Sequence, residues 1–362
     1  MRNLSMLVRI ILIMGLSFIV LLSMVGCADS TEEPVNGEET QDEATEEEGA
    51  IEGDYKFALV YGATHPYFEP MGPAAKDAAR DFNIPEPTIS APQDWDQPQQ
   101  NVVLDGLVAR GYNGIALMTS EPVAGNDQIS RMVEEGVHVI TFGGPPDLPT
   151  KSYFTLATDV FESAYLGTKN LIEAMDGEGN IVHAAGMVVD TNTAIRMEGV
   201  EKAVSEHPDV QLIQTLADLD DFEAAQNDLS SLLAARGSEI NGIISTAYVP
   251  SVVTANLIRE LDMPEIKNVG IDSDPELLKA IEDGYATGTM SQNPYGQAYL
   301  SLYALKLFAD GYTWKEGDHL FVDSGTFFIN KDNLDSVDEE ISRVTEDILE
   351  TMVEKYFNEP SN

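Results

Sequence analysis

The fold of this chain is most constrained by a repeated alternation between short apolar runs and longer amphipathic stretches. The apolar runs have strand character and occupy residues 57–61, 114–118, 138–142, 180–184, 242–245 and 268–271. The stretches between them have helical character and occupy residues 74–82, 99–110, 124–135, 162–175, 196–207, 222–235 and 251–261. Strands without polar alternation are buried on both faces. The pattern therefore predicts an α/β fold with parallel sheets covered by helices on both sides.

The loops that follow the apolar runs carry the candidate binding residues, because ligands of open α/β sheets bind at the carboxyl ends of the strands. These loops supply aromatic rings, an arginine, a carboxylate and an amide at His65, Tyr67, Phe68, Arg196, Tyr248, Asp272 and Gln292. Aromatic rings pack against the apolar faces of a sugar ring, and planar polar groups bind its hydroxyls. This mixture predicts an uncharged, polyhydroxylated ligand.

Several of these residues have a second interpretation. Tyr67 and Phe68 belong either to the core or to a cleft, and the proline directly before them favours a loop at the cleft. Arg196 stands near the start of a predicted helix, where the helix dipole disfavours a cation, and this favours a specific role. Asp272 either binds the ligand or caps the following helix, unless one of the next two residues is the cap.

Three further candidates stay open. Gln292 either contacts the ligand or serves only as a hinge residue. Trp95 either closes the cleft as a lid or packs on the surface. His65 is a weak metal candidate, because the few other histidines show no ligand spacing, so we expect neither a metal nor a cofactor.

The first residues predict export. Arg2 and Arg9 precede an apolar run over residues 10–25, and this run is too short for a comfortable membrane span. Residues 24–27, at the end of this apolar run, resemble a bacterial lipobox. The resemblance implies a signal peptide over 1–26 and a lipid on Cys27. A plain secretory signal and an uncleaved anchor are the alternatives. Cys27 is the only cysteine, which excludes an internal disulfide framework and a cysteine zinc site.

Residues 27–54 predict an acidic tether. Residues 28–54 hold twelve acidic side chains and no Lys or Arg, with few large apolar side chains. Such a segment cannot bury enough surface to offset the entropy of ordering, and its like charges keep it extended. We expect it to space a folded body away from a membrane.

The body resembles the ribose-binding type of periplasmic binding protein, the sugar-binding class of ABC importers. The resemblance covers nearly all of residues 55–330, and its motifs are 65–68, Arg196-Met197-Glu198-Gly199, Val269-Gly270-Ile271-Asp272, Gln292 within 291–294, and Thr158-Asp159. It implies two Rossmann-like lobes joined by three crossings, with the ligand in the cleft. The first lobe would comprise 55–157 with 292–322, and the second 158–291 with 323–355.

Two departures from the family pattern bear on the ligand. The family's Asp-Arg pair after the third strand is replaced by Gly143-Gly144, and its Asn-Asp pair is replaced near Ala247-Tyr248. These changes remove groups that bind sugar hydroxyls and argue against ribose itself. A deoxy-sugar, a larger sugar, an autoinducer-like furanosyl compound and another polar metabolite stay open.

The resemblance implies an extracytoplasmic solute-binding component of an ABC importer that closes on its ligand about a hinge. Its partners would be a small polar ligand, the ABC permease and, through the lipid, the outer face of the cytoplasmic membrane; we expect a monomer. A receptor that feeds chemotaxis or a sensor kinase is the alternative. No motif of a nucleotide-binding, serine, zinc or cysteine enzyme occurs, so we expect no catalysis, and a carbohydrate-active enzyme ranks last.

The charge of the body excludes one class of partner and generates a prediction. Residues 55–362 keep 50 acidic and 18 basic side chains, a formal charge of −32, which excludes nucleic-acid binding through a basic surface. Self-repulsion of this size is screened by mobile cations. If the acidity is halophile-like, the melting temperature will rise steadily from dilute buffer to molar sodium chloride. A flat melting temperature across that series would leave the acidity as a solubility device.

Overall fold

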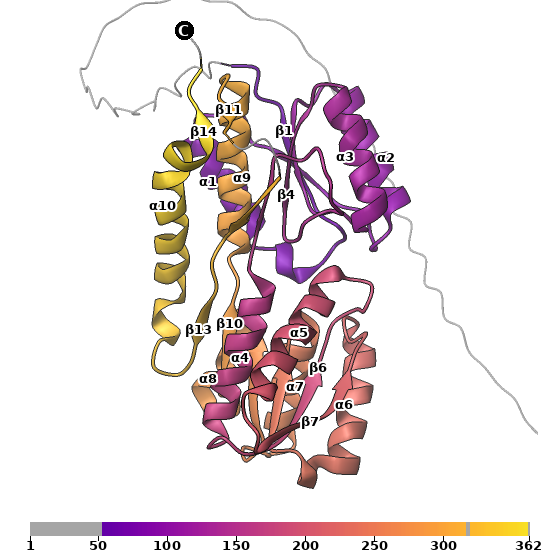
Figure 1. Ribbon diagram of the computed structural model, residues 1–362, viewed down its shortest axis with the longest axis vertical. Helices are drawn as coiled ribbons and strands as arrows, with labels where there is room; N and C mark the ends of the chain where they lie inside the picture. The colour runs from indigo at the N-terminus through magenta and orange to yellow at the C-terminus, as the bar shows by residue number, and fades with distance from the viewer. Residues whose placement is uncertain (1–52, 316–318, 361–362) are drawn as a thin grey trace, which may run out of the picture. The chain divides into compact units, whose positions relative to one another are not determined.

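Two six-stranded sheets, each covered by helices, organise the residues that the computed structural model describes, 53–315 and 319–360 (Figure 1). The first sheet is entirely parallel, in the order β12-β5-β4-β3-β1-β2. Its strands are β1 (Phe57–Val60), β2 (Thr88–Ser90), β3 (Gly114–Leu117), β4 (His138–Phe142), β5 (Phe154–Ala157) and β12 (Leu320–Asp323). The predicted signal peptide, Cys27 and all but the end of the predicted tether lie outside the described residues.

The second sheet has the order β13-β10-β9-β8-β6-β7 and is parallel except for its edge strand β13. Its strands are β6 (Gly179–Ala184), β7 (Val210–Leu216), β8 (Gly242–Ser245), β9 (Lys267–Ile271), β10 (Gly288–Ser291) and β13 (Phe327–Ile329). The chain passes between the two sheets after β5, after β10 and after β12. The predicted α/β class, with two lobes built on mainly parallel sheets, is confirmed, and three crossings join the two sheets.

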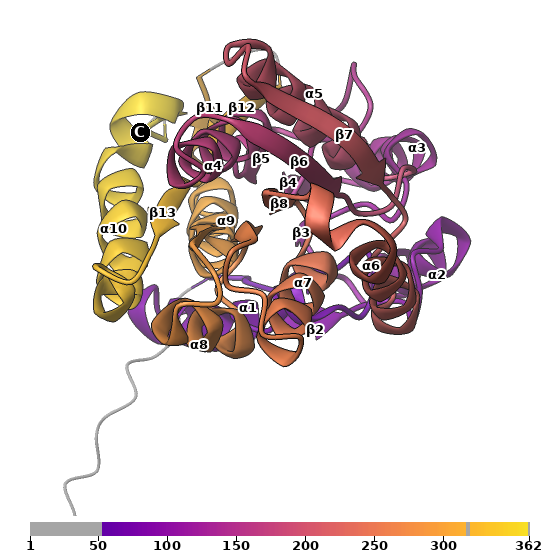
Figure 2. The same cartoon turned by 90° about the horizontal axis from the view of Figure 1, so that it is seen from below.

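Helices cover both faces of each sheet, as the apolar strands require. In the first lobe, α1 (Met71–Asp81) and α9 (Pro294–Ala309) pack on one face, and α2 (Gln97–Ala109) and α3 (Pro122–Glu134) on the other. In the second lobe, α4 (Val160–Ala174) and α5 (Thr191–Ser205) cover one face, and α6 (Phe222–Arg236) and α7 (Tyr248–Glu260) the other, with α8 (Pro275–Asp283) beside α7 (Figure 2). The 3₁₀ helices are Pro66–Phe68, Gly237–Glu239 and Leu334–Ser336.

The last helix departs from the predicted division into lobes. Residues 323–355 were assigned to the second lobe, and β13 lies there, but α10 (Val337–Tyr356) packs beside α9 of the first lobe (Figure 1). The physical reason is its apolar face, which buries Met352 completely in the first-lobe core. A short antiparallel pair, β11 (Thr313–Trp314) with β14 (Phe357–Asn358), fixes the end of this segment to the same lobe.

Aspartates start many of the helices, so part of the acidity has a local structural use. Side-chain oxygens of the residues before α2, α4, α5, α6 and α8 accept hydrogen bonds from backbone N–H groups of the first helical turn, at Asp96, Asp159, Asp190, Asp221 and Asp274. Such caps satisfy donors that have no partner within the helix, and the negative charge is favourable at the positive end of the helix dipole.

The contact between α4 and α5 requires a glycine. A Cβ atom at Gly199 would lie 2.5 Å from the backbone oxygen of Phe161 and 3.1 Å from the nitrogen of Tyr165, and a helix backbone cannot move aside cheaply. We expect Gly199→Ala to lower the free energy of unfolding by about 1–3 kcal/mol through overpacking. Gly106 on α2 is the matched control, because nothing lies within 4 Å of its added Cβ.

Gly106→Ala should raise the free energy of unfolding by about 0.5–1 kcal/mol, because alanine favours a helix interior more than glycine does. Urea unfolding of the two variants measures both effects. Changes of the same sign and size in both would contradict the close approach of α4 and α5.

Candidate functional site

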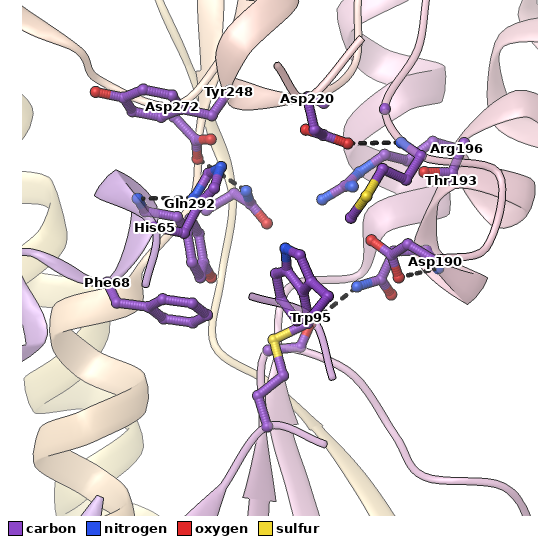
Figure 3. Close-up of a pocket in the computed structure, with 17 residues that line it drawn as sticks. His65, Phe68, Trp95, Asp190, Thr193, Arg196, Asp220, Tyr248, Asp272 and Gln292 are labelled. Atoms are coloured by element: carbon purple, nitrogen blue, oxygen red, sulfur yellow. Dashed lines mark hydrogen bonds between the residues drawn. The ribbon is translucent and has the colours of Figure 1, made fainter. Parts of the chain in front are cut away.

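The predicted ligand-binding residues all line one pocket between the lobes (Figure 3). The space between the walls of the pocket is about 610 Å³, and part of it is open to solvent. The first lobe contributes His65, Tyr67, Phe68 and Trp95, the second contributes Arg196, Tyr248 and Asp272, and Gln292 comes from the crossing after β10. The carboxyl ends of the strands in both sheets thus meet at one place.

The first lobe forms an aromatic wall. The turn Pro66–Phe68 is fixed by His65, whose Nδ1 accepts a hydrogen bond from the backbone N–H of Tyr67 at 3.2 Å. Phe68 is buried and stacks on Tyr61, with ring centroids 4.5 Å apart. The hydroxyl of Tyr67 donates to Oε1 of Gln297 at 3.1 Å. These contacts make the wall rigid before any ligand arrives.

Trp95 lies in the wall of the pocket, with its ring tilted against Phe68 at a centroid distance of 6.3 Å. The ring packs directly over the backbone of Gly62, where an added Cβ would lie 2.1 Å from it. Trp95 therefore does not pack on an outer surface, which was one of the two alternatives for this residue. Its half-buried ring keeps one part available to the cleft.

One nitrogen of the Arg196 guanidinium is buried without a hydrogen-bond acceptor among the described residues. Arg196 projects from α5, the residue is 8% exposed, and the nitrogen without an acceptor is Nε. No carboxylate of the described residues forms an ion pair with it, although Asp190 and Asp272 line the same pocket. Buried cationic donors are costly when they are unsatisfied, and such groups in a native structure require an explanation.

Asp272 is not the cap of the following helix, so one of the two alternatives for it is eliminated. Asp274 caps α8 by accepting from the N–H of Glu276 at 2.8 Å. The carboxylate of Asp272 accepts instead from Nε2 of Gln292 at 2.8 Å. Its backbone has a φ of 71°, in the left-handed region, where Asp and Asn are found more often than other non-glycine residues. Burial raises the pKa of Asp272 to about 6.

Two aromatic residues meet across the cleft. The rings of His65 in the first lobe and Tyr248 in the second are 5.7 Å apart and nearly perpendicular. The Tyr248 hydroxyl donates to the carboxylate of Asp274. Burial lowers the pKa of His65, and the charge of Asp220 opposes this effect only in part.

The sequence reasoning missed several pocket residues that follow β6 and β7. Asp190 and Asn192 begin α5, and Asn192 donates from Nδ2 to the backbone oxygen of Gly143 across the lobes at 3.1 Å. Asp220 follows β7 and accepts from the N–H of Met187 at 2.6 Å. Asp220 would have been a candidate if residues 210–216 had been recognised as a strand, because the loops after strands carry the binding residues. This edge strand contains polar side chains and is only half-buried, so its pattern does not indicate a strand.

Two negative findings apply to the described residues alone. Within 53–315 and 319–360, no cluster of three or more His, Cys, Asp or Glu side chains is arranged to hold a metal ion. In the same ranges, none of the helices has both the length and the apolarity needed to cross a membrane.

Comparisons with known proteins agree with this architecture. The family model described as a periplasmic binding protein domain matches residues 57–313. A xylose/arabinose-binding protein of Sulfolobus acidocaldarius is 21% identical over 246 residues, which is 64% of this chain, and the match spans only 60% of that relative. The D-allose-binding periplasmic protein of Escherichia coli is 21% identical over 258 residues, 68% of this chain and 81% of the relative.

Solved structures share the fold. A periplasmic solute-binding protein of an ABC transporter from Actinobacillus succinogenes, with bound D-allose, has a TM-score of 0.72 at 19% identity and covers 78% of this chain and 100% of its own. One from Burkholderia graminis, in complex with D-arabinose, has a TM-score of 0.71 at 23% identity and covers 78% and 98%. The family model spans well over half of the sequence, and the resemblance predicted from the motifs is confirmed. The chain therefore belongs to the family of periplasmic binding proteins.

Proposed function

We propose that this chain is the extracytoplasmic solute-binding component of an ABC importer and that it captures a small uncharged sugar between its lobes. The observation that carries the proposal is that Arg196 lines the pocket while its buried Nε has no hydrogen-bond acceptor among the described residues. Ligand oxygens that accept hydrogen bonds would complete its coordination. The sugar-binding relatives named above support this ligand class.

The remaining pocket groups fit a polyhydroxylated ligand. Sugar hydroxyls both donate and accept, so they can donate to the carboxylates of Asp190 and Asp272 while accepting from Arg196. The rings of Phe68 and Trp95 offer apolar faces for the C–H side of a sugar ring. Carboxylates outnumber the single guanidinium in this pocket, which disfavours a phosphorylated ligand.

Capture would proceed by closure of the lobes about the crossings. A ligand shifts a two-state equilibrium only if it contacts the closed form better than the open form. Here the aromatic wall belongs to the first lobe, while Arg196 and Asp272 belong to the second. A ligand that contacts both therefore favours closure, and a permease would recognise the closed form.

The cellular setting follows from the first residues and the family. We place the body outside the cytoplasm, attached by a lipid on Cys27 to the outer face of the cytoplasmic membrane and spaced from it by residues 28–54. We propose that it acts as a monomer without catalysis.

Arg196→Ala should weaken sugar binding by a hundredfold or more without lowering the stability of the ligand-free protein. Each charge-assisted hydrogen bond is worth about 1.5–3 kcal/mol, and the loss of two reaches about a hundredfold in affinity. A thermal-shift screen over xylose, arabinose, allose, inositol and sugar phosphates identifies a ligand, and calorimetry then measures affinity.

Arg343→Ala, on the exposed side of α10, is the control and should leave affinity unchanged. If Arg196→Ala binds the sugar with near wild-type affinity, Arg196 is not part of the binding site. If only sugar phosphates raise the melting temperature of the protein, the proposal of an uncharged ligand is wrong.

Asp272→Asn should raise the free energy of unfolding of the ligand-free protein by about 2 kcal/mol at pH 7. Burial raises the pKa of Asp272 to about 6, above its ordinary value of 3.8, so the folded state holds this proton more tightly than the unfolded state. The wild-type protein therefore loses this contribution to its stability as the pH rises from about 4 to about 6. Asparagine removes the charge and still tolerates the left-handed backbone.

Urea unfolding from pH 7 to pH 3 measures the difference in free energy of unfolding between variant and wild type. The difference should be full above about pH 6, should fall as the pH drops toward 4, and should disappear near pH 3, where Asp272 is protonated in both states. Asp127→Asn on the exposed face of α3 is the control. A difference that is constant with pH would show that Asp272 does not carry the buried charge.

A further inference from the structure

A second compartment continues directly from the ligand pocket. It lies between the loops after β3 and β4 of the first lobe and the loop before α5 of the second, and the space between its walls is about 720 Å³, part of it open to solvent. The two compartments share walls formed by Trp95, Met118, Met187, Asp190 and Asn192. A molecule in the second compartment would therefore touch the same side chains as a sugar in the first.

Glycines stand at the junction between the compartments. Gly143 lines the first and Gly144 lines the second. A Cβ at Gly143 would lie 2.7 Å from the sulfur of Met118, and a Cβ at Gly144 would lie 3.1 Å from Nδ2 of Asn192. A side chain at Gly144 would extend toward Asn192 of the second lobe, so its absence leaves space at the boundary between the compartments.

The second compartment is more apolar than the first. Pro122, Pro145 and Val189 line it in addition to the shared tryptophan and methionines. Its other wall residues, Thr119, Ser120, Glu121 and Thr191, are polar, while Arg196, Asp220 and Asp272 line only the first compartment. Val189 is 78% exposed at the edge of the second compartment. Such walls suit a ring with an apolar face, and the shared Asp190 and Asn192 provide polar groups at the boundary.

We propose that the ligand is a glycoside, in which a sugar ring occupies the first compartment and a second ring, linked through the anomeric oxygen, occupies the second. This inference rests on the proposed function and narrows its ligand class. A free monosaccharide fills only the polar compartment and leaves the apolar one to water. Trp95 then contacts both rings, because it lines both compartments.

Matched ligand series test the proposal by calorimetry on the whole chain. Xylose, glucose and galactose are compared with their 4-nitrophenyl glycosides and with xylobiose, cellobiose and β-1,4-galactobiose. We expect at least one glycoside to bind about tenfold to hundredfold more tightly than its parent monosaccharide, from the added contacts of a ring-sized group. A gain only in the nitrophenyl arm identifies an aryl substituent, and a gain in the disaccharide arm identifies a second sugar.

Substitutions at the second compartment test the location of the second ring. Val189→Trp and Gly144→Leu should each reduce the ratio of glycoside affinity to monosaccharide affinity to about 1, because each fills the compartment. Val102→Trp is the matched control, because Val102 on α2 is 74% exposed and lines neither compartment; it should keep the full ratio.

Each outcome decides one claim. Monosaccharides that bind as tightly as all of their glycosides would overturn the two-ring ligand and leave the proposed function standing. If the ratio of glycoside affinity to monosaccharide affinity is unchanged in both Val189→Trp and Gly144→Leu, the second ring lies elsewhere and the inference is wrong. Absence of binding by every sugar in either form would overturn the proposed function, and the inference with it.

Discussion

Strands that are apolar on both faces must be covered by helices on both sides, and the position of the site follows from this constraint. In a parallel sheet the covering helices connect the ends of the strands, so every strand leads into a loop at the same edge. Both sheets of this chain are built in this way, and the crossings after β5, β10 and β12 bring their carboxyl edges together. The cleft is therefore a consequence of topology, and the local sequence decides only which side chains project into it.

The central strands were predictable from the sequence, and the edges of the sheets were not. The predicted runs agree with β1, β3, β4, β6, β8 and β9 to within one residue at either end. These strands are buried on both faces, so the apolar signal is continuous. The edge strand β7 is half-buried and contains Gln211 and Gln214, so its pattern resembles that of a loop. The placement of α10 was missed because an amphipathic helix shows that it has an apolar face but not which lobe that face covers.

The site was predictable where a residue type was rare and obscure where it was common. Arg196 and Trp95 could be singled out because the chain has few basic residues and 2 tryptophans. Asp190 and Asp220 could not, because each is one of 62 acidic residues, many of which cap helices or face water. Asp272 was found through the strand that precedes it, and only the structure shows that Asp274 is the cap. In this chain, a rare residue type therefore identified a candidate binding residue more readily than a common one.

The features that suit the pocket for a ligand also oppose the stability of the empty protein. The buried Nε of Arg196 without an acceptor and a left-handed Asp272 with a raised pKa each raise the free energy of the ligand-free state. They persist because the aromatic wall, the capped helices and the buried sheets fix the backbone around them. A ligand that supplies acceptors to Arg196 and donors to Asp272 relieves these costs through contacts with the second lobe alone. Closure is favoured by the further contacts that the same ligand makes with the aromatic wall of the first lobe, so recognition involves both lobes.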